Sequence, residues 1–132
     1  MDILLKTHQH FRWIVVLVAV IAVLVFLLTW LQKKESRLDR ILMAIFTGCL
    51  DLQWLMGLIL FIYVATTTGL ARKHWEHGFT LTLALVLAHF SAKWKASPAP
   101  VRARNYLFIT LGVIVLIIAG VAVYPTGWRL PG

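Results

Sequence analysis

Residues 13–31 read WIVVLVAVIAVLVFLLTWL and contain no charged side chain. A helix needs about 20 predominantly apolar residues to cross the hydrocarbon core of a bilayer, and this run has that length. Trp13 and Trp30 stand near its two borders, where aromatic rings commonly meet the lipid headgroups. The run therefore predicts a membrane-spanning helix.

Three further apolar runs follow, at residues 41–71, 75–94 and 105–124. Asp51 interrupts the second run, and the third carries His77 and His89. Of the 132 residues, 61% are hydrophobic and only 14% are charged, which is too few to coat a soluble domain. We expect a single transmembrane domain over residues 1–132, with helices at about 10–32, 38–68, 73–95 and 103–124.

The segments between the runs are short. Short connections make sequential helices antiparallel neighbours. The predicted fold class is therefore all-α: an integral membrane, antiparallel four-helix bundle with up-down-up-down topology. Both termini then lie on one side of the bilayer.

The formal net charge is +8, and the basic residues flank the apolar runs. This arrangement indicates topology signals and contact with anionic headgroups, and no nucleic-acid partner is expected. Eight Lys and Arg residues fall in the first and third connections and five fall on the other side, which predicts cytoplasmic connections and outward termini. The eight are Lys33, Lys34, Arg37, Arg40, Lys93, Lys95, Arg102 and Arg104.

Four of the five histidines should gather at the outer face. His8 and His10 begin the first helix, and His74 and His77 begin the third, which runs in the same direction. Imidazoles from two helices of a bundle can hold one b-type haem. We expect His8 and His77 as the ligands, with His10 as a substitute for His8. Arg12, four residues after His8, could neutralise a haem propionate.

Two other interpretations stay open. Copper or zinc could bind His8 and His77 with His10, His74 and Glu76, because imidazole and carboxylate are suitable ligands. In the haem interpretation, by contrast, Glu76 or a backbone carbonyl could orient a ligating imidazole through its second nitrogen. The chain could also be a non-catalytic accessory subunit of a larger membrane complex.

Asp51 and His89 lie deep in neighbouring helices, and Gln53 shares their region. Ionisable groups inside a membrane usually face the bundle interior and have a partner. We expect these three to form a buried polar group centred on an Asp51–His89 contact. Its role is either a proton relay or quinone pocket, or an interhelical hydrogen bond that aids packing. Gly57, four residues after Gln53, would allow a close helix approach.

Several segments carry a family resemblance: HQHFRW at 8–13, RLD at 37–39, DLQWLMGL at 51–58, EH at 76–77 and AH at 88–89. Together they resemble a family of small bacterial four-helix integral membrane proteins labelled cytochrome b-like, over most of the chain through the third helix. The fourth helix is similar only in hydrophobicity. The family pattern has a histidine three residues before Phe-Arg-Trp, which corresponds to His8, whereas His10 stands where a small residue is usual. The resemblance thus favours His8 over His10.

The expected function is electron transfer by a haem b-binding membrane cytochrome, quinone-linked or within a respiratory complex. We expect an electron carrier or subunit rather than a stand-alone enzyme, and no catalytic residues are assigned. The predicted location is the bacterial inner membrane, multi-pass, with both termini on the periplasmic side. Besides the lipid bilayer, candidate partners are a quinone, other membrane redox subunits and a second copy of the chain.

Overall fold

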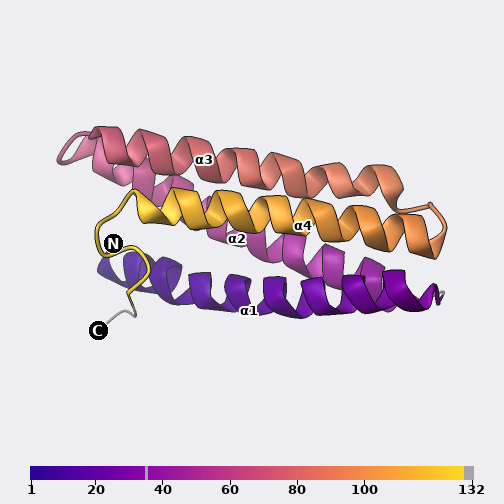
Figure 1. Ribbon diagram of the computed structural model, residues 1–132. Coiled ribbons are helices and arrows are strands. Elements are labelled where there is room, and N and C mark those ends of the chain that lie inside the picture. Colours follow the sequence, from indigo (N-terminus) through magenta and orange to yellow (C-terminus); the bar gives the residue numbers. More distant parts are fainter. Residues whose placement is uncertain (35, 130–132) are drawn as a thin grey trace.

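The computed structural model describes residues 1–34 and 36–129, and this part of the chain contains helices and no strand. Four α-helices and one 3₁₀ helix follow one another along the chain (Figure 1). They are α1 (Asp2–Gln32), α2 (Leu38–Thr66), α3 (Arg72–His89), η1 (Phe90–Trp94) and α4 (Ala99–Ala122).

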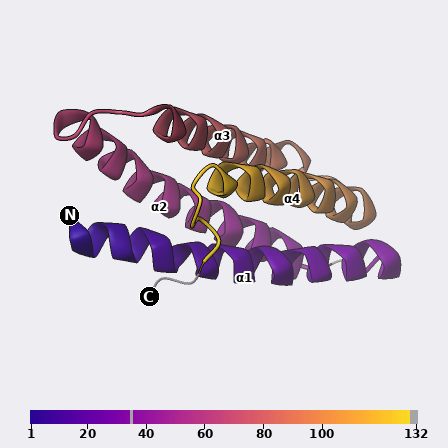
Figure 2. The ribbon, with the colours of Figure 1, turned by 60° about the vertical axis from the view of Figure 1, so that its left-hand side comes forward.

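The helices form an antiparallel bundle. Met1, the α2–α3 connection and the segment after α4 lie at one end, which we call the terminal end (Figure 1). The α1–α2 and α3–α4 connections lie at the other, the far end. Both α1 and α3 pack against α2 and α4, so α1 and α3 face each other diagonally across the bundle (Figure 2). The predicted helical bundle is confirmed.

Three of the helices, α1, α2 and α4, are long and apolar enough to cross a membrane. The third predicted span, α3, is shorter, and its first two turns carry Arg72, Lys73 and Glu76. Large apolar side chains such as Leu17, Leu24 and Val115 are exposed on the outside of the bundle, each by more than half of its surface. This exterior is the reverse of a water-soluble helical bundle, which buries its apolar stripe.

Two helices begin earlier than expected. The first starts at Asp2, so the polar stretch before Arg12 is already helical. The fourth starts at Ala99, directly after Pro98, and includes Pro100. Proline is accepted in a first helical turn because its missing N–H has no intrahelical partner there.

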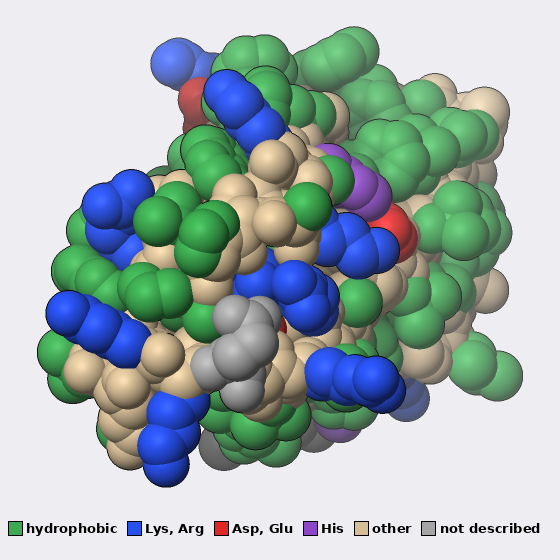
Figure 3. Space-filling model, turned by 90° about the vertical axis from the view of Figure 1, so that its right-hand side faces the viewer, with side chains coloured by type: hydrophobic (Ala, Val, Ile, Leu, Met, Phe, Trp, Pro, Cys, Tyr) green, Lys and Arg blue, Asp and Glu red, His purple; other side chains and the backbone are tan. Residues whose placement is uncertain are grey.

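Exposed Lys and Arg side chains surround the far end of the bundle (Figure 3). The interior is filled by small and aromatic residues, among them Ala22, Phe26, Phe46 and Val113, which are fully enclosed. Phe26 also meets Tyr106 edge to face, with ring centroids 5.4 Å apart. The apolar interior fixes the bundle and leaves most polar side chains at its two ends.

Candidate cofactor site

His8 projects from α1 toward α2, where a glycine gives its ring room. A Cβ on Gly57 would lie 3.2 Å from Cε1 of His8, closer than an ordinary van der Waals contact. The amide Nε2 of Gln53, one turn earlier in α2, donates a hydrogen bond to the backbone oxygen of His8 at 2.8 Å. Gly57 therefore makes room for the imidazole of His8 and does not serve the close approach of two helices that was expected. Gln53 holds the backbone of α1 at His8.

His77 is oriented by the last turn of α4. Its Nδ1 donates a hydrogen bond to the backbone oxygen of Gly120 at 2.7 Å. That carbonyl is among the last four of α4, which lack an intrahelical donor. With Nδ1 protonated, the neutral ring carries its lone pair on Nε2, the arrangement of most metal-ligating histidines.

His8 and His77 lie at the same end of the bundle, on the diagonally opposite helices α1 and α3. The ring of His8 faces Gly57 of α2, and that of His77 bonds to Gly120 of α4. The side chains of His8, His77 and Arg12 all belong to the terminal end of the bundle. The structure thus brings together the two histidines and the arginine that sequence reasoning assigned to one site.

Four buried polar atoms in this region have no hydrogen-bond partner among the described residues: His8 Nδ1, Arg12 Nε, Trp13 Nε1 and Gln53 Oε1. Buried polar groups are nearly always paired, and each unpaired one costs about 1–3 kcal/mol. Arg12 Nε and Trp13 Nε1 are donors, so they suit an anionic oxygen. These two orphaned donors, at the same end of the bundle as His8 and His77, fit a haem with a propionate.

The segment after α4 folds back over Arg12. Trp128 meets Trp13 edge to face at 5.9 Å, and the Arg12 guanidinium lies 5.3 Å from the Trp13 ring centroid and 5.6 Å from that of Trp128. Arg12 Nη2 also donates to the backbone oxygen of Arg129 at 3.3 Å. This segment covers the arginine and limits the access of water to it.

Tyr124 lies beside His74 and His77 at the start of α3. Its ring centroid is 5.1 Å from that of His77 and 6.3 Å from that of His74, edge to face in each case. Burial raises the pKa of the Tyr124 phenol. The ring next to His77 therefore stays uncharged at neutral pH.

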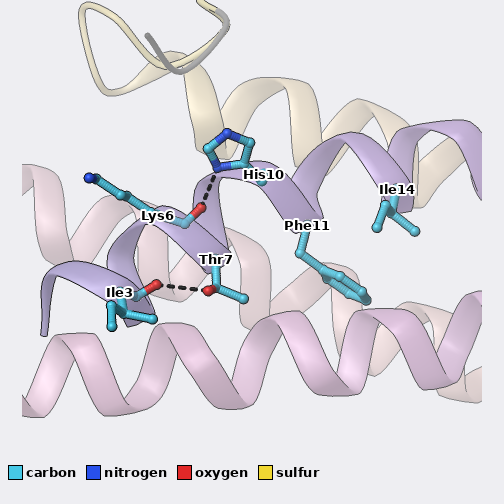
Figure 4. Close-up of a pocket in the computed structure, with 6 residues that line it drawn as sticks. All are labelled: Ile3, Lys6, Thr7, His10, Phe11 and Ile14. Carbon is cyan, nitrogen blue, oxygen red and sulfur yellow. Dashed lines mark hydrogen bonds between the residues drawn. The ribbon is translucent and has the colours of Figure 1, made fainter.

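The other predicted ligands face elsewhere. His10 is exposed, and its Nδ1 donates to the backbone oxygen of Lys6 at 2.7 Å, beside a shallow groove along α1 (Figure 4). His74 Nδ1 accepts a hydrogen bond from the backbone N–H of Ala71 at 2.8 Å and so caps α3. Glu76 pairs with Arg72 one turn earlier at 2.6 Å.

These positions bear on the copper or zinc interpretation. Across the described residues, no three His, Cys, Asp or Glu side chains gather closely enough to hold a metal ion. His8 and His10 are both helical, two residues apart, so their rings point in different directions. Of the two orienting groups considered for the imidazole, the backbone carbonyl is present and Glu76 points outward.

The Asp51–His89 contact is present. Nε2 of His89 donates to Oδ1 of Asp51 at 2.8 Å. The pair is half exposed, however, so its expected burial was wrong. Gln53 was also assigned to it wrongly, because residues two apart on a helix point to different sides, and Gln53 faces His8 instead.

Sequence reasoning overlooked four contributors to the terminal-end site: Trp13, Gly57, Gly120 and Trp128. Trp13 and Trp128 have the signature of membrane-border residues, and Gly57 was expected to serve helix packing. The part played by Gly120 is a backbone carbonyl, which no side-chain pattern could reveal. The arrangement depends on which turns of α1, α2 and α4 meet α3.

Comparison with known proteins gives no match to a family model, to a curated protein or to a solved structure.

Proposed function

We propose that the chain is a membrane-spanning electron carrier that binds one b-type haem at the terminal end of the bundle. The observation that carries the proposal is that His8 and His77 lie at the same end of two diagonal helices, with Nδ1 of His77 bound to the Gly120 carbonyl and two unpaired donors, Arg12 Nε and Trp13 Nε1, nearby. A b-type haem in a helical bundle needs two such imidazoles. When bound, it supplies an iron that exchanges one electron with a partner.

The membrane placement is supported by the apolar exterior and by the three long apolar helices. In the same arrangement, α3 and η1 cross together over residues 72–94, with the charged first turns of α3 at the surface. The Lys and Arg residues of the far end favour a cytoplasmic position for that end, by the bias known for short loops. The resemblance to small bacterial cytochrome b-like proteins favours the inner membrane.

Each residue of the site then has a defined task. His8 and His77 would hold the haem iron. Arg12 Nε and Trp13 Nε1 would donate hydrogen bonds to a propionate oxygen, which would give both atoms the partner that they lack within the described chain. The Gly120 carbonyl and the Gly57 gap keep the two imidazoles in their orientations.

Haem accounts for this geometry better than copper or zinc, because it requires only two protein ligands. His10, His74 and Glu76 are each held in other contacts, which leaves two imidazoles for a mononuclear metal. Structural and catalytic zinc sites commonly use three or four protein ligands. An accessory subunit without a cofactor would leave Arg12 Nε and Trp13 Nε1 without the acceptor that a propionate supplies.

Haem titration of the purified protein in lipid nanodiscs tests the proposal. Haemin should bind once per chain and give the spectrum of a six-coordinate, low-spin iron. His8→Ala and His77→Ala should lose that spectrum and regain it with added imidazole, whereas His10→Ala should match the wild type. Imidazole rescue shows that the variants are folded. Equal binding by all three variants, or tight binding of copper or zinc with no haem, would overturn the proposal.

A further inference from the structure

Asp51 and His89 form a second polar site, away from the histidines of the terminal end. Asp51 lies in α2, and His89 is the last residue of α3. Their hydrogen bond is 2.8 Å long, and the side chains are 49% and 55% exposed, respectively. The bond uses one oxygen of the carboxylate, and the second oxygen can accept a hydrogen bond from a ligand.

The position of the pair is unusual for a membrane helix. Asp51 lies 13 residues after Leu38, the first residue of α2, which is roughly 20 Å along the helix axis. Leu52, Leu55 and Phe90 nearby are exposed apolar side chains. Ionisable residues at this depth are costly unless they meet a polar partner. Given the membrane placement proposed above, this half-exposed pair needs a partner that arrives through the lipid.

An open groove of about 280 Å³ runs beside the pair, between α2 and the segment that contains His89, Ser91 and Ala92. Ala44 and Gly48 line it from successive turns of α2. A Cβ on Gly48 would have no atom within 4 Å, so the groove is open at this point. Pockets for drug-sized ligands measure about 300–1,000 Å³, so this smaller groove suits a compact group such as one flat ring.

We propose that this groove binds the head group of a lipid-soluble hydroquinone, with a ring hydroxyl donating a hydrogen bond to the Asp51 carboxylate. His89 is a positioning residue, since its Nε2 fixes the carboxylate. A lipid phosphate fits less well: although Arg40 and Lys95 line the groove, the Asp51 carboxylate would repel an anion. A neutral hydroxyl donor meets the carboxylate without that repulsion.

The inference rests on the membrane placement and does not require haem. Binding is therefore measured on haem-free protein in nanodiscs of neutral phosphatidylcholine, with decyl-ubiquinol as the probe under anaerobic conditions. We expect saturable binding to the wild type. Gly48→Leu should weaken it at least tenfold by filling the groove, and Asp51→Asn should weaken it by a similar factor. His89→Gln should have a smaller effect.

Ala65→Leu is the matched control, because Ala65 is exposed on the same helix and outside the groove. It should bind as the wild type does, and all variants should keep wild-type helicity by circular dichroism. Absence of saturable binding, or unchanged binding by Gly48→Leu, would overturn the proposal. Displacement of the probe by short-chain phosphatidylglycerol would also overturn it, because the groove would then bind a lipid phosphate. So would a wild-type dimer that excludes the probe and that dissociates in the Asp51→Asn variant, because a second copy of the chain would then occupy the groove. A protein that binds the probe but does not bind haem would contradict the proposed function and leave this proposal standing, because the assay uses haem-free protein.

Discussion

Asp39 and Arg102 form an ion pair that is fully enclosed at the far end of the bundle, with Arg102 Nε 2.9 Å from Asp39 Oδ2. Arg102 Nη1 also donates to the backbone oxygen of Ser97 at 2.7 Å. Asp39 is the second residue of α2 and Arg102 lies in the first turn of α4, so the pair ties together the two connections at that end. A buried charge of this kind is tolerable only while its partner is present.

Asp39→Asn should therefore lower the free energy of unfolding by about 3–5 kcal/mol, the usual cost of removing one charge of a buried ion pair. Unfolding in mixed micelles, followed by circular dichroism, measures the change. Glu76→Gln is the matched control, because it removes the exposed Arg72–Glu76 pair, which is worth about 0.3–0.5 kcal/mol. A loss for Asp39→Asn no greater than that of the control would contradict this role.

Gly57→Ala should weaken haem binding. The added Cβ would lie 3.2 Å from Cε1 of His8 and push the imidazole out of position. Overpacking of this sort costs about 1–3 kcal/mol, so we expect the haem dissociation constant to rise by about five- to 150-fold. Gly48→Ala, where the new Cβ meets nothing within 4 Å, should bind haem normally. Equal haem affinity of the two variants would show that Gly57 is not part of the site.

Gly120→Ala should destabilise the bundle and disturb His77. A Cβ at this position would overlap the side chain of Leu81 and lie 3.3 Å from Cγ2 of Thr80. We expect a loss of about 1–3 kcal/mol in the free energy of unfolding, and a changed spectrum in whatever haem remains bound. Thermal unfolding and the low-spin absorption bands provide the two measurements. A stable variant with an unaltered spectrum would show that α3 and α4 do not meet here.

Trp128→Ala should loosen the segment that covers Arg12. The substitution removes the Trp13–Trp128 contact and one of the two aromatic faces beside the guanidinium, worth about 0.5–1.5 and 0.5–1 kcal/mol, respectively. The backbone amides of Gly127 and Arg129, which are hydrogen-bonded within this segment, should then exchange hydrogen several-fold faster. Trp75→Ala, which removes the Phe61–Trp75 contact, should leave those two amides unchanged.

The helical bundle could be predicted from the sequence because long apolar runs and short connections leave few alternatives. The placement of His8 and His77 at one end followed from the same topology, since α1 and α3 begin at the same end. Helical periodicity also explains why the ring of His10 points away from that of His8. These features depend on spacing along one helix or on the order of the helices.

The remaining contacts depend on which turns of different helices meet. Arg102 was counted as a loop charge that sets topology, and nothing in its neighbourhood along the chain indicates burial against Asp39. Gln53 was grouped with Asp51 because the two are close in sequence, although they face different neighbours. The rotation of each helix about its axis decides such contacts, and uniformly apolar helices give little signal for it.

The absorption spectrum of the detergent-solubilised protein, expressed with sufficient haem supply, tests the central claim most directly. The reduced-minus-oxidised spectrum should show a Soret band and the sharp bands of a low-spin b-type haem, at one haem per chain. Preparations of His8→Ala and His77→Ala should lack those bands, and His10→Ala should retain them. A wild-type protein with no Soret band, either as isolated or after reconstitution with haemin, would contradict the account.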